Sequence, residues 1–192
     1  MSRIGLAYNA HQPWRHQSVL CKGGGLALIH RNDIITRPSK IAFQPTSFEL
    51  QLVSVQVSHI TVLVANVYRP PRCSKTTFLD EFAEMLTLIE RGFSEKLIIC
   101  GDFNLPGLNS ISIDDRLSTL LDTHGYQQHV SEPTRCNNLL DLLITPISSE
   151  MQTLVSNVTV VSSNDLSDHN LVCQRNLKSQ ILWLRNQISW PK

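Results

Sequence analysis

Residues 98–104 read IICGDFN, and this stretch decides how the whole chain is interpreted. An apolar run that ends at a glycine is typical of a buried strand whose end a ligand can approach closely. Alternate side chains of an extended segment point the same way, so Asp102 and Asn104 can converge on one ligand. The alternative is a turn in which both side chains bond their own backbone. The stretch therefore predicts the end of a buried strand and a candidate binding site beside it.

A second set of candidate residues lies in residues 167–170, which read SDHN. Asp168 and His169 are adjacent, so they cannot share one face of a strand and need different partners. A histidine near a phosphate can exchange protons at neutral pH when a carboxylate orients its ring. Asp141 interrupts the apolar residues 139–144 and is the candidate orienter, because a carboxylate in an apolar strand needs a partner. The alternatives are a solvated Asp141 at a strand edge and a purely structural His169.

A third set of candidate residues lies in residues 66–72, which read NVYRPPR and stand at the end of a stretch rich in β-branched residues. Tyr68 and Arg69 at the exit of a buried strand can offer a phenol and a guanidinium to phosphate oxygens. The alternative is a proline-rich turn with solvated basic residues.

Hydrophobic periodicity predicts strands that alternate with a few helices, which indicates α/β or α+β layering in one domain. We expect strands at residues 26–29, 48–57, 60–68, 97–100, 139–145 and 151–161, and helices at residues 77–91 and 114–124. The apolar positions of the second strand change phase between Leu52 and Val53, which predicts either a bulge or a strand covered on both faces. Thr77 and Asp80 resemble a capping box at the start of the first helix.

Composition excludes several classes of protein. The chain has 192 residues, 42% of them hydrophobic and 17% charged, and a net charge of +1, so it fits one domain with a core. Near neutrality means that any contact with nucleic acid needs a local basic patch. The apolar runs are too short to span a membrane, and the first residues do not read as a secretion signal, so we expect an intracellular protein, nuclear or cytoplasmic. The five cysteines include no C-x-x-C pair, so neither a disulfide framework nor a zinc site is expected.

Together these motifs resemble the endonuclease/exonuclease/phosphatase superfamily, most closely the endonuclease domains of non-LTR (LINE-type) retrotransposons. The matching blocks, in order, are GGGLAL (23–28), NVYRPPR (66–72), CGDFNLP (100–106), PTR (133–135), LLDLLIT (139–145) and SDHNLV (167–172). The resemblance implies a four-layer α/β sandwich, in which two mainly antiparallel sheets pack face to face and are flanked by helices. It places this domain at residues 23–173, after a poorly matched segment 1–22 and before a tail, 174–192, of unassigned structure.

The resemblance also implies a chemistry, because the family cleaves phosphate esters with a divalent metal, usually Mg²⁺, with Mn²⁺ as a substitute. Asp102 would orient or deprotonate the attacking water, while Asn104 and Tyr68 would hold the scissile phosphate. His169, oriented by Asp141, would stabilise charge on that phosphate. The remaining implied site residues are Asp168 at the metal or its water shell, and Arg69, Arg72 and Arg135 at the phosphates of a DNA substrate.

The sequence departs from the family pattern ahead of the glycine block. Family members carry there a strand ending in an asparagine and a strand with the main metal-binding glutamate. This chain has no acidic residue before Asp33, the context of Asn9 does not match, and Glu49 follows the glycines and is not assigned. We therefore expect a domain that lacks its first strands, has reduced affinity for Mg²⁺ and is weak or inactive. Sheet edges left exposed by the missing strands would favour self-association.

The sequence is compatible with three functions. The first is an endonuclease-like phosphodiester hydrolase with DNA as substrate. The second is a non-catalytic remnant that binds nucleic acid or protein. The third, a phosphoesterase for small molecules, is disfavoured because YRPPR and LDLLIT resemble the retrotransposon branch.

Overall fold

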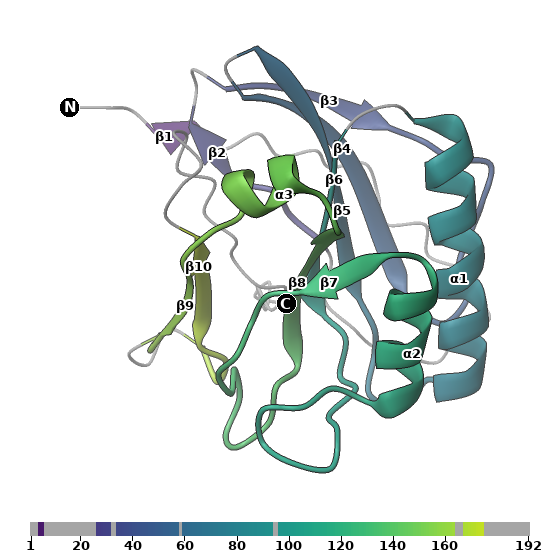
Figure 1. Cartoon of the computed structure of the whole chain (residues 1–192), viewed down its shortest axis with the longest axis vertical. Coiled ribbons are helices and arrows are strands. Elements are labelled where there is room, and N and C mark those ends of the chain that lie inside the picture. The colour runs from purple at the N-terminus through teal and green to yellow at the C-terminus, as the bar shows by residue number, and fades with distance from the viewer. Residues whose placement is uncertain are drawn as a thin grey trace, which may run out of the picture.

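The computed structural model describes residues 4–5, 26–31, 34–57, 59–93, 96–163 and 167–174 (Figure 1). Its strands are β1 (Ile4–Gly5), β2 (His30–Arg31), β3 (Ile35–Ser39), β4 (Glu49–Val57), β5 (Ile60–Tyr68), β6 (Lys96–Asp102), β7 (Tyr126–Gln128), β8 (Asp141–Pro146), β9 (Val158–Val161) and β10 (Leu171–Gln174). Its helices are α1 (Lys75–Gly92), α2 (Asp115–Thr123) and α3 (Ser149–Leu154). The glycines at 23–25 and the context of Asn9 lie outside the described residues, as does the tail beyond Gln174.

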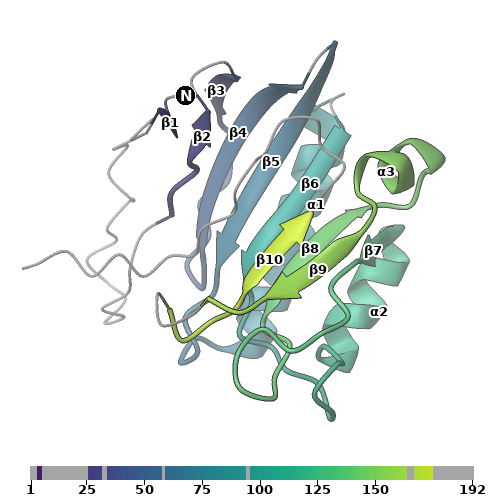
Figure 2. The ribbon, with the colours of Figure 1, turned by 90° about the vertical axis from the view of Figure 1, so that its left-hand side faces the viewer.

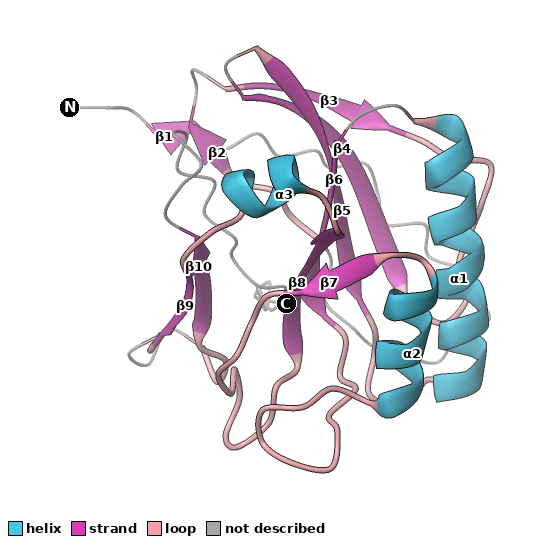
Figure 3. Ribbon diagram, viewed as in Figure 1, coloured by secondary structure: helices cyan, strands magenta, loops and turns pink. Residues whose placement is uncertain are grey.

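A six-stranded sheet with the order β3-β4-β5-β6-β8-β7 forms the centre of the fold (Figure 3). Every neighbouring pair in it is antiparallel except β5 and β6, which α1 connects as a crossover helix. Figure 2 shows α1 and α2 behind this sheet and the antiparallel pair β9–β10 in front of it. The predicted α/β class is therefore confirmed, with the six-stranded sheet, two small antiparallel pairs (β1–β2 and β9–β10) and flanking helices. The described part of the second sheet is small, since β9 and β10 are its strands.

The core between α1 and the sheet is built from the apolar stripe that helical spacing predicts. Phe78, Phe82, Leu86 and Ile89 are all buried. Phe103, directly after β6, meets the first two of these rings edge-on, with centroid distances of 5.9 and 5.5 Å. Aromatic packing of this kind fixes the end of β6, and with it Asp102, against the helix.

The sequence left two explanations for the phase change in β4, a bulge or a strand covered on both faces. It pairs with β5 residue for residue from Glu49–Tyr68 to Val57–Ile60, so it contains no bulge. Leu52, Val53 and Val55 are all buried, although successive side chains point to opposite faces. The strand is therefore covered on both faces.

Three local predictions need correction. The strand expected at residues 151–161 is instead helix α3 followed by β9, because the Ser148 side chain accepts a bond from the Met151 backbone and starts a helical turn. Residues 26–28 are not a strand, and pairing begins only at Ile29 and β2. The cap of α1 is Ser74, whose hydroxyl accepts from the Thr77 N–H, and not Thr77 itself. No helix in the described ranges has the length and apolar character needed to cross a bilayer.

Candidate active site

Four strands of the main sheet carry a polar residue at the same edge of the sheet, and these residues oppose one another directly. Glu49 opposes Tyr68, Tyr68 opposes Asp102, and Asp102 opposes Asp141 in the pairing of β4, β5, β6 and β8. Directly opposed residues on neighbouring strands project to the same face of the sheet. We call Glu49, Tyr68, Asp102 and Asp141 the strand-end row. The motifs indicated three of these residues, and the register places them side by side.

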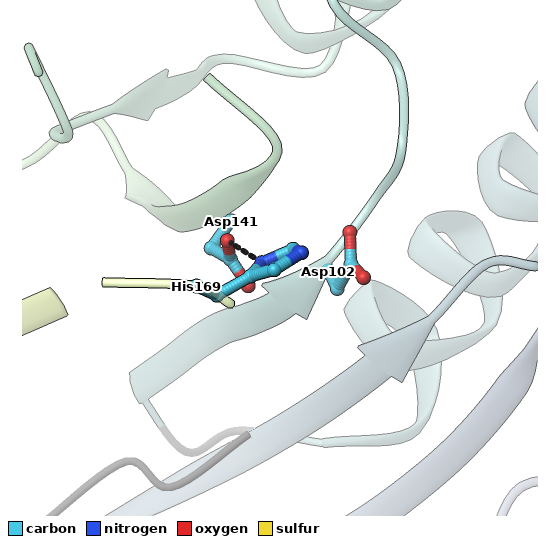
Figure 4. Close-up of side chains that lie close together, drawn as sticks. All are labelled: Asp102, Asp141 and His169. Atoms are coloured by element: carbon cyan, nitrogen blue, oxygen red, sulfur yellow. Dashed lines mark hydrogen bonds and ion pairs between the residues drawn. The ribbon is translucent and has the colours of Figure 1, made fainter. Parts of the chain in front are cut away.

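His169 joins the strand-end row from a segment that is distant in sequence. Its Nδ1 lies 2.6 Å from Oδ2 of Asp141 (Figure 4). The imidazole lies between the carboxylates of Asp141 and Asp102 in this view. His169 and Asp102 are each only 1% exposed. The structure thus pairs His169 with the carboxylate expected to orient it, in a site largely removed from bulk water.

Thr134 is a supporting residue that the sequence interpretation missed. It is fully buried, and its hydroxyl accepts from the backbone N–H groups of Leu140 (3.1 Å) and Asp141 (3.0 Å). Its carbonyl accepts from the Asn170 N–H at 2.7 Å. Thr134 therefore ties the start of β8 to the segment that carries His169. Its place in the PTR motif was visible, but the sequence alone does not show which backbone groups it bonds.

Asn104 lies beside the strand-end row in a backbone conformation that is uncommon for residues other than glycine. Its φ is +49°, in the left-handed region. Its N–H donates to Oδ1 of Asp102 at 3.1 Å, and its Nδ2 donates to the Arg69 carbonyl at 2.9 Å. The turn chemistry offered as an alternative explanation is therefore present, and it holds Asn104 close to Asp102 at the same time.

The structure corrects the expectation that Arg69 contacts a DNA phosphate. The residue is 2% exposed, and its guanidinium donates to the carbonyls of Asn104 (3.1 Å) and Cys73. Nη1 and Nη2 of this guanidinium are therefore held against backbone carbonyls inside the protein and are not presented at the surface. The motif resembled a phosphate-binding site because an arginine at a strand exit is equally compatible with both roles.

Arg72, Arg135 and Asp168 lie at the surface rather than in the buried cluster. Arg72 is exposed. Arg135 Nη2 lies 2.6 Å from Oδ2 of Asp168, and their side chains are 39% and 50% exposed. Both arginines remain accessible to a polyanion, whereas the Asp168 carboxylate is paired with Arg135.

The described residues fit a divalent cation. Asp102, Asp141 and His169 each offer one ligand atom, and these atoms lie within 4.8 Å of one another. The Nε2 of His169 is buried and has no hydrogen-bond partner among the described residues, as expected where a ligand or water completes a site. Two carboxylates suit Mg²⁺ or Mn²⁺, whereas an imidazole ligand is more usual for transition metals than for Mg²⁺. Asp168, the residue expected at the metal, is not a member of this group.

Glu49 is the member of the strand-end row that the sequence interpretation left unassigned. Its Oε2 is buried without a hydrogen-bond partner in the described part of the chain, and burial raises the pKa of its carboxyl group. The pairing register of the β4–β5 hairpin would have identified Glu49. Two nine-residue strands joined across residues 58 and 59 place Glu49 opposite Tyr68.

We expect Glu49→Gln to stabilise the fold at pH 7. A folded-state pKa raised above the unfolded value means that stability declines as pH rises from the unfolded pKa through the folded one. Glutamine removes the cost of burying a charged carboxylate, so the free energy of unfolding should rise by about 1 kcal/mol at pH 7. Partial solvation of the side chain keeps this gain small, and it should vanish near pH 3. Urea denaturation at both pH values measures the difference. A variant less stable than wild type at pH 7 would contradict this account.

A separate hollow lies at the other end of the same strands. It has a volume of about 320 Å³ and includes Leu97 and Pro146 in its lining. Leu97 lies near the start of β6 and Pro146 at the end of β8, whereas Asp102 and Asp141 lie at the opposite ends of these strands. This hollow is therefore not part of the candidate site.

Comparison with known proteins agrees with this geometry. The family model described as "Endonuclease-reverse transcriptase" matches residues 62–173, which is more than half of the chain. The endonuclease domain of TRAS1, a telomere-specific non-LTR retrotransposon, is a similar solved structure, with 16% identity, a TM-score of 0.57, and coverage of 74% of this chain and 68% of that one. D. rerio TDP2, humanized by 14 mutations, gives 14% identity, a TM-score of 0.51, and coverage of 71% and 65%.

At these identities the solved structures show a shared fold and nothing finer. No curated protein sequence matches the chain. The family match runs from within β5 to within β10 and includes the motifs that contribute Tyr68, Asp102, Asp141 and His169. The chain therefore belongs to the endonuclease/exonuclease/phosphatase superfamily, in the group described as endonuclease-reverse transcriptase.

Proposed function

We propose that this chain is a metal-dependent phosphodiester hydrolase of the DNA endonuclease type, and that its activity is weak. The observation that carries the proposal is the buried His169–Asp141 pair beside the carboxylate of Asp102. A carboxylate near an oriented imidazole supplies both a base for water and a stabiliser of charge on phosphate. Retrotransposon endonucleases are among the proteins that share the fold, which makes DNA the substrate we favour.

Each residue of the site has a proposed part in hydrolysis. Asp102 orients or deprotonates the water whose oxygen forms the new bond to phosphorus, as the bond to the leaving oxygen breaks. His169, held by Asp141, stabilises the charge that accumulates on the phosphate. Tyr68 and the free amide hydrogen of Asn104 donate to phosphate oxygens, since an amide nitrogen has two donors.

A bound Mg²⁺ or Mn²⁺ ion would supply further neutralisation of charge on the phosphate. The carboxylates of Asp102 and Asp141 would hold it, with Asp168 near its water shell, which leaves Nε2 of His169 for the phosphate. Arg72 and Arg135 are proposed contacts to the DNA backbone, because both are accessible. Contacts of this kind give affinity without sequence preference.

Burial of the site supports weak activity. Asp102 and His169 are almost fully covered, so a DNA phosphate reaches them only when the covering segments move.

Self-association through sheet edges belongs to the same proposal. Strand β3 is an outer strand of the main sheet, and Ile35 on it is 56% exposed. An exposed edge of this kind can pair with another chain.

Nicking of supercoiled plasmid tests the proposal. We expect slow nicking in Mn²⁺, slower nicking in Mg²⁺ and none in EDTA. His169→Ala should lower the rate about 100-fold or more, since it removes charge stabilisation at the phosphate. Asp122→Ala, on the exposed surface of α2, is the matched control and should nick like wild type.

The outcomes separate the three candidate functions. Equal background nicking by wild type and His169→Ala would end the enzyme interpretation, and DNA binding without nicking would then favour a non-catalytic remnant. Hydrolysis of a soluble inositol phosphate, with no action on DNA, would favour a phosphoesterase for small molecules.

A further inference from the structure

The guanidinium of Arg69 occupies a position that phosphate binding does not explain. The residue lies directly after β5 and is 2% exposed, and its Cζ lies 5.7 Å from the centroid of the Phe78 ring. Burial lowers the pKa of this guanidinium, which reflects the cost of keeping a cation away from water. A cation at this depth needs partners for its donors and its planar face. Nη1 and Nη2 of Arg69 have such partners, whereas its buried Nε has none among the described residues.

The partners of Arg69 belong to the segment that carries Asn104. Nη1 of Arg69 donates to the Asn104 carbonyl at 3.1 Å, and Nδ2 of Asn104 donates back to the Arg69 carbonyl at 2.9 Å. The Arg69 N–H donates to the carbonyl of Asp102 at 2.9 Å. Nη2 of Arg69 donates to the Cys73 carbonyl, which closes the turn after β5. Residue 69 therefore joins the exits of two parallel strands through side-chain and backbone bonds in both directions.

Asn104 needs this support because its backbone is in the left-handed region, with φ of +49°. An asparagine in that region has other conformations of comparable energy, and it stays there only when neighbouring groups hold it. Two hydrogen bonds hold Asn104 there: its N–H donates to Oδ1 of Asp102, and its carbonyl accepts from Nη1 of Arg69.

We propose that Arg69 is a positioning residue that sets Asn104 for contact with the scissile phosphate. The inference rests on the proposed function, since it assigns Asn104 to that contact. Arg69 acts through Asn104 and touches no substrate. Lysine cannot replace it, because one ammonium group cannot reach two carbonyls in fixed directions while stacking on Phe78.

The direct test is nuclear magnetic resonance of the ¹⁵N-labelled chain. Arg69→Lys should shift the side-chain amide and backbone signals of Asn104 while signals from α2 stay in place. Arg91→Lys, an exposed residue in the last turn of α1, is the matched control and should leave Asn104 unchanged. Arg69→Met fills the same volume without donors and replaces the lysine variant if that variant does not fold. Unmoved Asn104 signals in a folded Arg69 variant would overturn the proposal.

Kinetics provide a second, independent measurement. Arg69→Lys should lower the nicking kcat about 10- to 100-fold with little change in KM, as expected when a supporting residue is lost. Combining it with Asn104→Ala should give a variant within about twofold of Asn104→Ala alone, because both changes remove one contact. Losses that multiply, or a rise in KM with a changed salt dependence, would show that Arg69 acts separately and would overturn the proposal. If wild type nicks no DNA, the proposed function fails, while the resonance comparison still decides the positioning role.

Discussion

Asp102→Asn should lower the rate of plasmid nicking about 1,000-fold. The Asp102 carboxylate lies at the end of β6, 1% exposed, within 4.8 Å of ligand atoms on Asp141 and His169. Asparagine has nearly the same size as aspartate and keeps one side-chain oxygen, so it can still accept the 3.1 Å bond from the Asn104 N–H. It cannot take a proton from water and offers a metal no charge. Loss of a general base costs about 100- to 10,000-fold, and the missing metal ligand adds to that.

The comparison is meaningful only if the variant keeps its fold. Asp122→Asn makes the same chemical change on the exposed face of α2 and should leave both nicking and unfolding midpoint unchanged. Rates are measured at saturating Mn²⁺, so that weakened metal affinity does not mimic a loss of base. If Asp102→Asn retained more than a tenth of the wild-type rate, Asp102 would not be the base.

Sequence patterns predicted those parts of the fold that depend on local periodicity. β5 begins and ends at the residues the β-branched run indicated, and the helical stripe of α1 is buried as its spacing requires. The pairing of Asp141 with His169 was also predictable, because a carboxylate in an apolar strand needs a partner. The strand prediction for the segment after β8 was wrong, because the Ser148 side chain caps a helix there and α3 forms despite the mixed apolar pattern.

Long-range register and hydrogen bonding explain what the sequence could not show. Whether Arg69 faces solvent or the interior depends on the position of the Asn104 carbonyl, which lies 35 residues away. Thr134 and Glu49 are similar cases, since their roles follow from which residues lie opposite or adjacent in space. These contacts are set by the pairing of β4 with β5, of β5 with β6 and of β6 with β8, not by local preference.

Gly101→Ala should prevent folding or lower the free energy of unfolding by about 4 kcal/mol or more. Gly101 has φ of +133°, a conformation that residues with a side chain rarely adopt. A Cβ there would lie 1.9 Å from the carbonyl oxygen of Val67, its partner in the β5–β6 ladder. The backbone of β5 cannot yield without breaking the ladder, so both strain and lost hydrogen bonds contribute.

Gly92→Ala is the matched control, because a Cβ at the end of α1 meets nothing within 4 Å. Alanine is a better helix former than glycine, so this variant should be as stable as wild type or about 0.5 kcal/mol more stable. Urea denaturation of the three proteins measures the differences. The glycine at position 101 lets β5 approach β6 closely enough to bring Tyr68 beside Asp102. A Gly101→Ala variant as stable as wild type would therefore mean that β5 and β6 are not paired in this register, and the strand-end row would lose its basis.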